Sequence, residues 1–392
     1  MKYNRYKIKD LISEISMGPF GSNIKVECFV DSGIPVLNGS NLIGFALNDG
    51  SFRYVTEEKA NSLGKANAYR GDVVITHRGT LGQIVFIPSD SKFERYVISQ
   101  SQFRVKCNEK IMPEYLTYYF HTKIGQHKLL SNASQVGVPA LARASTSFQE
   151  LEIEIPPMIQ QQKVVSLLET IRVKIELNNA INDNLEQQAK ALYQRMFIDN
   201  PVSGGYMGTL SDIADITMGQ SPNGSSYNED GNGAVFFQGR AEFGFRFPSV
   251  RLYTTEPKRM ACANDTLMSV RAPVGDLNVA YTDCCIGRGL AAIHSKSNQQ
   301  SFVLYTMFSL HKQLDVFNGE GTVFGSINRT SLTELPIFIP SDREIVKFEA
   351  IVAPIDAAIR NNYEEICRLE KIRDALLPKL ISGKLDVSAV EL

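Results

Sequence analysis

Two short polar stretches carry side chains that could pair with the edges of nucleic-acid bases. Asn38-Gly39-Ser40-Asn41 follows the apolar pair Val36-Leu37, and Gln238-Gly239-Arg240 follows Phe236-Phe237. Asn and Gln amides can pair bidentately with adenine, and an Arg guanidinium can do so with guanine. Because Asn, Gly and Ser are also common turn residues, either stretch taken alone fits a base-reading loop or an ordinary turn.

A second pair of loops carries basic groups after apolar runs. His77-Arg78-Gly79-Thr80 follows Val73-Val74-Ile75, and Arg271-Ala272-Pro273 follows Thr266-Leu267-Met268. The same loop thus carries such groups twice with different residues, which favours two similar readers of different sequences. With one Arg ahead of each Leu-x-Ile-x-Ile-Pro segment, the candidate base- or phosphate-contacting residues are Asn38, Ser40, Asn41, His77, Arg78, Thr80, Arg143, Gln238, Arg240, Arg271 and Arg329.

Residue patterns typical of enzymes are missing from the sequence. It contains no G-x-x-x-x-G-K-[ST] phosphate loop, no G-x-S-x-G elbow, no H-E-x-x-H motif and no Gly-rich dinucleotide fingerprint between a strand and a helix. The six cysteines form no C-x-x-C pair and do not cluster with the five histidines, which argues against a zinc site or a disulfide framework. We therefore expect no catalytic residue and no metal, and buried thiols.

A long helical segment must position these loops. After Pro156-Pro157 the chain runs to Phe197 without Gly or Pro, which predicts a helix about 60 Å long. Apolar residues recur at steps of three and four, and Asn178 and Asn182 occupy the middle of the same stripe. This is a heptad pattern, and it requires a partner helix.

The partner helix is predicted in the same chain. A shift of 184 residues lays Leu151, Ile153 and Ile155 onto Leu335, Ile337 and Ile339, and it matches Asn178 with Asn362. Pro378 predicts a kink or an end near the end of this second helix. The predicted helix–helix contacts are Leu168, Ile171, Ile175, Asn178, Leu185, Leu192, Val352, Ile355, Ile359, Asn362, Leu369 and Leu376.

The globular parts repeat as well. Ile15-Ser16-Met17-Gly18 answers to Ile216-Thr217-Met218-Gly219, and Gly71-Asp72-Val73 answers to Asn264-Asp265-Thr266. We also expect a strand over 97–105 and a helix over 113–120. The predicted fold is α+β, a tandem repeat of a mixed globular domain plus a long helix. The predicted domain boundaries are 1–155, 156–200, 201–339 and 340–392.

Composition places the chain among ordinary globular proteins. It has 392 residues, 43% of them hydrophobic and 21% charged, and Met1 is followed by polar residues without a signal core, so we expect a cytoplasmic protein. Residues 1–150 carry 18 Lys and Arg against 13 Asp and Glu, whereas residues 201–340 carry 10 against 12. A nucleic-acid partner is compatible with this distribution but is not required by it.

Three helical motifs resemble one known family. The I-P-P-x-x-x-Q-x-K-V opening at 155–164, the K-I-E-L-N-x-x-I-N run at 174–182 and the L-L-P-K-L-I-S-G-K-L run at 376–385 are similar to those of the specificity subunit of type I restriction-modification enzymes. The similarity covers nearly the whole chain. Its helical motifs are specific, whereas the globular parts match in plan only.

This resemblance implies a non-catalytic subunit that recognises double-stranded DNA. Each globular domain would read one half of a bipartite target, and the two helices would form an antiparallel, pseudo-two-fold coiled coil as a spacer. Two modification subunits would dock on it and carry S-adenosylmethionine, while this chain would hold no cofactor. The sequence leaves open whether ATP-dependent restriction subunits also join, and it does not give the target bases or the spacer length.

A second interpretation is a structural adaptor. Its globular domains would bind proteins, and its coiled coil would only space them. Selection from a random duplex pool separates the two, because an adaptor selects no DNA sequence. A self-contained nuclease or methyltransferase is disfavoured by the missing motifs.

Overall fold

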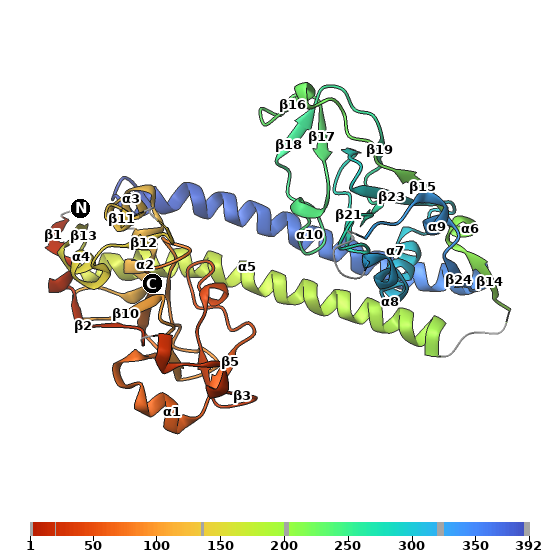
Figure 1. Cartoon of the computed structure of the whole chain (residues 1–392). Coiled ribbons are helices and arrows are strands. Elements are labelled where there is room, and N and C mark those ends of the chain that lie inside the picture. Colours follow the sequence, from red (N-terminus) through yellow and green to blue (C-terminus); the bar gives the residue numbers. More distant parts are fainter. Residues whose placement is uncertain (1–2, 20, 135–136, 200–203, 320–324, 388–392) are drawn as a thin grey trace. The chain divides into compact units, whose positions relative to one another are not determined.

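The computed structural model describes residues 3–19, 21–134, 137–199, 204–319 and 325–387. They form an α+β protein in which mixed sheets and short helices accompany two long helices (Figure 1). The chain divides into two compact units. Unit 1 comprises Met1–Glu176 and Ile366–Leu392, and unit 2 comprises Leu177–Glu365. Each unit thus contains one globular part together with a segment of both long helices.

Unit 1 contains short strands and helices followed by the start of the first long helix. Its strands are β1 (Asn4–Lys7), β2 (Ile12–Met17), β3 (Phe29–Val30), β4 (Ile34–Val36), β5 (Arg53–Val55), β6 (Asn67–Tyr69), β7 (Asp72–Thr76), β8 (Ile84–Phe86), β9 (Arg95–Val97), β10 (Gln102–Cys107), β11 (Ala133–Ser134), β12 (Ala140–Leu141) and β13 (Glu152–Ile155). Its helices are α1 (Glu57–Ser62), α2 (Pro113–His121), α3 (Lys123–Leu129), α4 (Ala144–Glu150) and the first part of α5 (Met158–Tyr193).

Two main sheets form the globular part of unit 1. One has the strand order β2-β10-β7-β8, and the other has the order β3-β5-β4-β9-β6. Neighbouring strands are antiparallel except for β4 and β9, which are parallel. In β13 the sequence Glu-Ile-Glu-Ile alternates, so that Ile153 and Ile155 are buried while the two glutamates are exposed. Its pairing with β1 brings the chain to Pro156, directly before α5.

Unit 2 repeats this arrangement. Its elements are β14 (Tyr206–Thr209), α6 (Leu210–Ile213), β15 (Ala214–Met218), β16 (Tyr227–Asn228), β17 (Ala234–Phe237), β18 (Leu252–Thr254), β19 (Met260–Ala261), β20 (Thr266–Ser269), β21 (Leu277–Val279), β22 (Cys284–Ile286), β23 (Leu290–Ser295), α7 (Gln300–Ser309), α8 (His311–Asp315), α9 (Arg329–Thr333), β24 (Pro336–Ile339) and much of α10 (Asp342–Ile381). The orders β15-β23-β20-β21 and β16-β18-β17-β22-β19 match those of unit 1 strand for strand. The predicted repeat is therefore confirmed at the level of topology.

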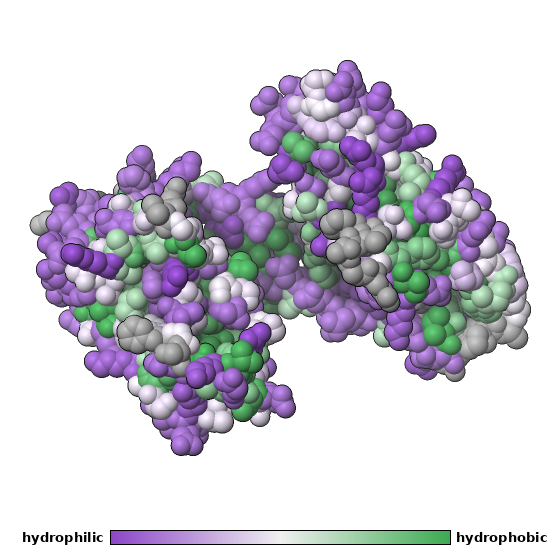
Figure 2. Space-filling model, in the orientation of Figure 1, coloured by the Kyte–Doolittle hydropathy of each residue, from purple (hydrophilic) through white to green (hydrophobic). Residues whose placement is uncertain are grey.

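The surface of unit 2 is polar at one end of its second sheet. Figure 2 shows hydrophilic residues gathered over β16 and β18. The turn after β16 exposes Glu229, Asp230 and Asn232. This turn precedes β17, so part of the acidity of unit 2 lies at the opposite end of that strand from Gln238.

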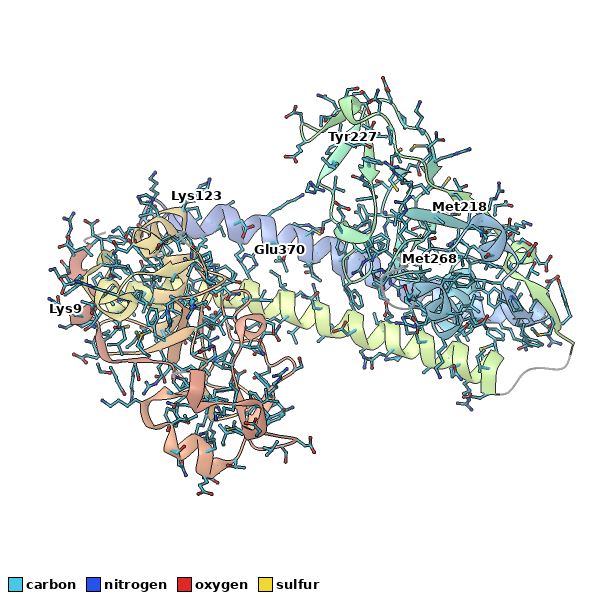
Figure 3. All side chains as sticks on the ribbon, viewed as in Figure 1. Lys9, Lys123, Met218, Tyr227, Met268 and Glu370 are labelled. Atoms are coloured by element: carbon cyan, nitrogen blue, oxygen red, sulfur yellow. The ribbon has the colours of Figure 1, made fainter. Side chains whose placement is uncertain are left out.

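The inner strands of the unit 2 sheet pack small residues between large ones. Met218 on β15 and Met268 on β20 both pair with Ala291 on the intervening strand β23 (Figure 3). Met268 and Ala291 are fully buried. A small residue on the central strand leaves room for the long flexible methionine side chains on both sides.

Both long helices contribute to the hydrophobic core of each unit. In unit 1 the core includes Val164, Val165 and Leu168 from α5 together with Leu377 and Leu380 from α10. In unit 2 it includes residues from the other end of each helix, Ala189, Tyr193, Phe348 and Val352 among them. The globular parts are consequently completed by the helices rather than merely attached to them.

Some of the predicted helix–helix residues pack between the two helices, and others join the hydrophobic cores of the units. Ile171, Ile175, Ile366, Leu369 and Leu376 pack together in unit 1. Leu192, Val352 and Ile355 join the core of unit 2, where Leu185 is half-buried and Ile359 is fully buried. None of the twelve predicted residues is exposed. Residues later in α5 contact residues earlier in α10, so the helices run antiparallel.

The polar positions of the seam are hydrogen-bonded. Asn362 Nδ2 donates to Asn182 Oδ1 at 2.9 Å, and Asn182 Nδ2 donates to the Ile359 carbonyl at 3.4 Å. Asn178 Nδ2 donates to Glu365 Oε2 at 2.8 Å. Asn178 and Asn362, which the repeat matches, therefore have different partners. Because buried amides need partners, these bonds favour one register of the helices over its neighbours.

Some local predictions need correction. The single strand expected over 97–105 is two strands, β9 and β10, because the chain turns at Ser99–Gln102. The first long helix is α-helical to Tyr193 and continues as a π-helix over Gln194–Asp199. The second continues for three residues beyond Pro378, which removes only one backbone donor from its last turn. Among the described residues, no helix is both long and apolar enough to cross a membrane.

Burial at the seam leads to a prediction about stability. Ile359 is fully buried, and Ile359→Asp would place an unpaired carboxylate between the helices of unit 2. We expect a loss of at least about 3 kcal/mol in the free energy of unfolding, measured by urea denaturation of the whole chain. Ile351→Asp is the matched control, because Ile351 on the same helix is 52% exposed and its replacement should change stability little. Equal losses for the two variants would contradict this seam.

Candidate nucleic-acid interface

In unit 1 one side chain joins the two loops that the sequence singles out. Gln83 precedes β8, and its Nε2 donates to the Gly39 carbonyl at 3.0 Å. Its Oε1 accepts from Thr76 Oγ1 at the end of β7, also at 3.0 Å. The loop after β4 is thereby held against the loop after β7. Asn38 and Arg78 thus belong to one surface at one end of the sheets.

Two further segments meet the loop after β7. The backbone N–H of His77 donates to the Ser101 carbonyl, and a His77 ring nitrogen lies 3.1 Å from the Gln100 carbonyl. On the other side Arg78 forms a β-bridge with Ala140, and Leu141 N–H donates to the His77 carbonyl. The loop therefore has a fixed backbone, with its Arg side chain exposed.

A glycine at the end of β2 allows a close backbone approach. A Cβ atom on Gly18 would lie 1.9 Å from the Ser99 carbonyl oxygen. Only glycine avoids this clash, because it has no Cβ atom. Beside this approach is a surface hollow of about 590 Å³ whose polar lining includes Gly18, Asn23, Lys65, His77, Arg78 and Gln100. Two basic groups and two amides thus converge on one depression in unit 1.

Unit 2 builds the same junction with different residues. Arg240 after β17 forms an ion pair with Asp276, which precedes β21. Asp276 stands where Gln83 stands in unit 1, one residue before the equivalent strand. An ion pair therefore replaces the amide link between the two loops.

The remaining contacts of the unit 2 loops also repeat. Val270 N–H donates to the Gly289 carbonyl, as His77 does to Ser101, and Arg271 forms a β-bridge with Ser326, as Arg78 does with Ala140. A Cβ on Gly219 would lie 2.1 Å from the Gly287 carbonyl oxygen. The matching Ile-x-Met-Gly sequences are therefore explained by one close backbone approach that occurs in both units.

The predicted site residues differ in their access to a ligand. Ser40, Arg78, Thr80, Gln238 and Arg271 are exposed. Asn38 is also exposed, but its Oδ1 accepts from Ser40, which ties the two side chains together. Asn41 is only 1% exposed, accepts from Asn38 N–H and donates to the Asn48 carbonyl. Asn41 thus holds the loop, and its side chain is not free to contact a base.

Arg143 and Arg329 lie just outside the loop cluster. Arg143 is the N-cap of α4 with a left-handed backbone (φ 48°), and Arg329 is the first residue of α9; both are exposed. Each is two residues from a backbone bond to the main loop, made by Leu141 to His77 and by Ile327 to Val270. The structure brings them near the cluster, and among the described residues no recorded hydrogen bond or ion pair joins either side chain to it.

The structure adds residues that sequence reasoning did not select. Gln83 and Asp276 link the loops, while Gln100 and Arg288 occupy equivalent turns beside them, and Arg288 is exposed. The spacing is the same in the two units: Gln83 lies eleven residues after Asp72, and Asp276 lies eleven residues after Asp265. This equal spacing is the sequence signal that could have identified the two linking residues.

Comparisons with known proteins find specificity subunits of type I restriction enzymes. Residues 23–187 match the family model described as the type I restriction modification DNA specificity domain. A Methanocaldococcus jannaschii protein provisionally named the type I restriction enzyme MjaX specificity subunit is 27% identical over 97% of this chain and 93% of its own length. The MjaIX specificity subunit of the same organism is 24% identical with the same coverage. The HindI specificity subunit of Haemophilus influenzae is 23% identical over 81% of this chain and 87% of its own length.

Over nearly its whole length the chain is similar to specificity subunits of type I restriction enzymes. Its fold is also that of the crystal structure of the type I restriction-modification system S subunit from M. genitalium. That structure is 16% identical, has a TM-score of 0.60, and is covered over 97% of this chain and 96% of the other. The resemblance recognised in the helical motifs is thereby confirmed.

Partial burial in the unit 1 loop predicts a pH effect on stability. Burial lowers the pKa of His77 below its usual value near 6.5, so the neutral ring is the folded form. Below about pH 6.5 the unfolded chain binds this proton more readily, and folding stability should fall. Urea midpoints at pH 7 and pH 5.5 should therefore differ less for His77→Gln than for the wild type. An unchanged pH difference would contradict a neutral, half-buried His77.

Proposed function

We propose that this chain recognises double-stranded DNA through the loop clusters of its two units. One observation carries the proposal: equivalent strand ends present the same set of loops in both units, with different base-pairing side chains in each. Exposed Asn38 and Arg78 stand in unit 1 where Gln238 and Arg271 stand in unit 2. Amide and guanidinium groups on rigid loops are suited to reading base edges.

The proposal assigns one half of a bipartite target to each unit. The helices would set the unread distance between the halves, since α5 and α10 both continue without a break through the division between the units. Two modification subunits would dock on this chain and supply S-adenosylmethionine and the methyl transfer. This assembly would act on DNA in the cytoplasm. This chain itself would contribute recognition rather than catalysis.

The excess of acidic residues over 201–340 does not oppose this proposal. Glu229 and Asp230 lie on the turn before β17, whereas Gln238 and Arg240 follow the end of that strand. Arg271 and Arg288 are exposed among the loops. A cationic loop surface can therefore coexist with a net negative unit, because only charges near the duplex act strongly on it at physiological salt.

The role of Arg240 can be tested by selection of bound duplexes. We expect Arg240→Ala to relax the preference at one position of one half-site by about 1 to 3 kcal/mol, because a guanidinium–guanine pair is lost. The other half-site should stay as it was, since its reader is untouched. Lys296→Ala is the control: Lys296 is exposed, carries a positive charge and follows β23, whereas the loop cluster precedes that strand. An unchanged target for Arg240→Ala would remove this residue from the readers.

A comparison variant separates base reading from phosphate contact. If Arg271 holds phosphate, Arg271→Ala should weaken all duplexes alike and lower the slope of log K against log salt by about 1. The selected sequence should then remain the same. If no variant and not even the wild type selects a sequence, the adaptor interpretation replaces DNA recognition.

The spacer role of the helices can be tested by lengthening both of them. Seven residues inserted between Glu176 and Leu177, and seven between Glu365 and Ile366, keep the heptad seam and leave each unit intact. The insertion adds about 10 Å of helix at 1.5 Å per residue. We expect the selected spacer to grow by about three base pairs at 3.4 Å each, with unchanged half-sites.

A loop insertion provides the control for the spacer experiment. Seven residues inserted after Asp230 lengthen an exposed turn of unit 2 and should leave the spacer unchanged. An unchanged spacer in the helix variant would show that the helices do not set the distance, even if DNA binding persists.

A further inference from the structure

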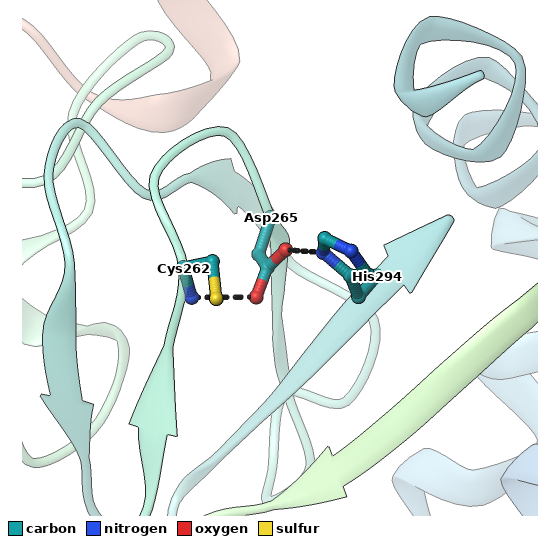
Figure 4. Close-up of side chains that lie close together, drawn as sticks. All are labelled: Cys262, Asp265 and His294. Carbon is teal, nitrogen blue, oxygen red and sulfur yellow. Dashed lines mark hydrogen bonds and ion pairs between the residues drawn. The ribbon is translucent and has the colours of Figure 1, made fainter. Parts of the chain in front are cut away.

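The turn between β19 and β20 brings three metal-ligating side chain types together. Cys262 and Asp265 lie on this turn, and His294 comes from the neighbouring strand β23 (Figure 4). Their ligand atoms all lie within 4.8 Å of one another. Asp265 Oδ1 is 2.6 Å from His294 Nδ1, and Asp265 Oδ2 accepts from the Cys262 backbone N–H at 2.8 Å. The carboxylate is thus fixed between the thiol and the imidazole.

In unit 1 the equivalent carboxylate, Asp72, is paired with a buried cationic side chain. Asp72 Oδ2 accepts from Tyr69 N–H at 2.9 Å, three residues earlier, as Asp265 does from Cys262. Arg104 Nη1 lies 3.2 Å from Asp72, and its side chain is only 5% exposed. Asp72 therefore has a permanent buried counter-ion.

Among the described residues of unit 2, no Arg or Lys is recorded as an ion-pair partner of the equivalent Asp265. Arg104 pairs with Val74 on β7, and the residue that pairs with the equivalent Leu267 on β20 is Ala292. Asp265 is 3% exposed, and its one recorded ion-pair partner among the described residues is His294. A buried carboxylate is stable when it is paired with a charge or coordinates a metal. Unit 2 has a thiol and an imidazole where unit 1 has the Arg, and this exchange favours coordination of a metal.

The surroundings of the cluster add negative rather than positive charge. Asp283 Oδ1 accepts from Ala263 N–H on the same turn at 2.8 Å. Arg360 of α10 also reaches the turn, but its guanidinium donates to the Asn264 side chain and to the Tyr281 carbonyl. The cluster thus combines a thiol, an imidazole and two nearby carboxylates, while the neighbouring guanidinium is engaged elsewhere.

We propose that Cys262, Asp265 and His294 bind a Zn²⁺ ion. Thiolate sulfur, imidazole nitrogen and carboxylate oxygen are the ligands that this metal prefers, and a tetrahedral site places them about 3.4 Å apart. A contraction by about an ångström, with the Asp265–His294 contact opening, satisfies that geometry. Cys262 and His294 are exposed, so the ion has a route in, and water can take the fourth position.

The site lies away from the reading loops. Asp265 immediately precedes β20 and His294 is near the end of β23, whereas Arg271 and Arg288 lie beyond the opposite ends of those strands. Zinc would therefore clip the turn to the sheet of unit 2. The metal should raise the melting temperature of unit 2 without changing the DNA sequence that the chain selects.

The test uses the full chain, stripped with a chelator and titrated with Co²⁺ as a spectroscopic substitute for Zn²⁺. We expect one equivalent to bind with a thiolate-to-cobalt absorption band, and Zn²⁺ to displace it. Cys262→Ser should abolish the band, and His294→Ala should weaken binding at least tenfold. Both side chains are exposed, so neither substitution should prevent folding.

Matched controls isolate the cluster. Cys28→Ser removes a partly exposed thiol of unit 1, and His311→Ala removes a histidine whose Nδ1 lies 3.2 Å from Asp315 without a cysteine beside it. Neither should alter the titration. No uptake at micromolar Co²⁺, or uptake that survives Cys262→Ser, would overturn the proposal and leave His294 as a simple partner of Asp265. Because duplex selection is measured separately, a failure here is distinct from a failure of DNA recognition.

Discussion

Neither compact unit closes its hydrophobic core without both long helices. In unit 1 the sheet of β2, β10, β7 and β8 is covered by α2, and the core extends to Leu168 of α5 and Leu380 of α10. In unit 2 the same role falls to Tyr193 and Phe348. Each globular part is therefore rigidly joined to the helices that it packs on, and this packing holds its loops in fixed positions.

The two units solve the same packing problem with opposite chemistry at one position. In unit 1 Phe45 packs against Tyr118 and His121, with Arg373 of α10 over its ring at 5.2 Å. In unit 2 Arg246 takes this place, since its carbonyl accepts from Val279 N–H as that of Phe45 does from Phe86. Arg246 Nη2 donates to Tyr305 and Asp356. A buried ion pair thus replaces an aromatic anchor, and removing Arg246 would leave the Asp356 carboxylate without its ion-pair partner.

The loops of the two units also keep equivalent backbones while their side chains differ. The Gln83 amide link of unit 1 and the Arg240–Asp276 ion pair of unit 2 hold equivalent backbones together with different side chains. Close backbone approaches at Gly18 and Gly219 are kept, because no side chain fits there. The two units thus combine a common backbone scaffold with different side chains at the loop contacts.

The sequence by itself determined the long helices, their seam and the tandem repeat. Heptad spacing and strand alternation are local periodicities, so Ile171, Ile359 and Ile153 are readable as buried residues from order alone. Only the tertiary structure decided which polar groups are free. Asn41 and Arg78 look alike as loop residues. The Asn41 side chain is hydrogen-bonded to backbone groups, whereas the Arg78 side chain is exposed.

The cysteines show the same limit. Cys262 was expected to be buried and is exposed, and its neighbour His294 lies 32 residues further along the chain. Strand pairing between β20 and β23 brings them together, and no short motif records that pairing. Side chains that meet through long-range sheet contacts leave no period in the sequence, because their spacing depends on loop lengths that vary freely.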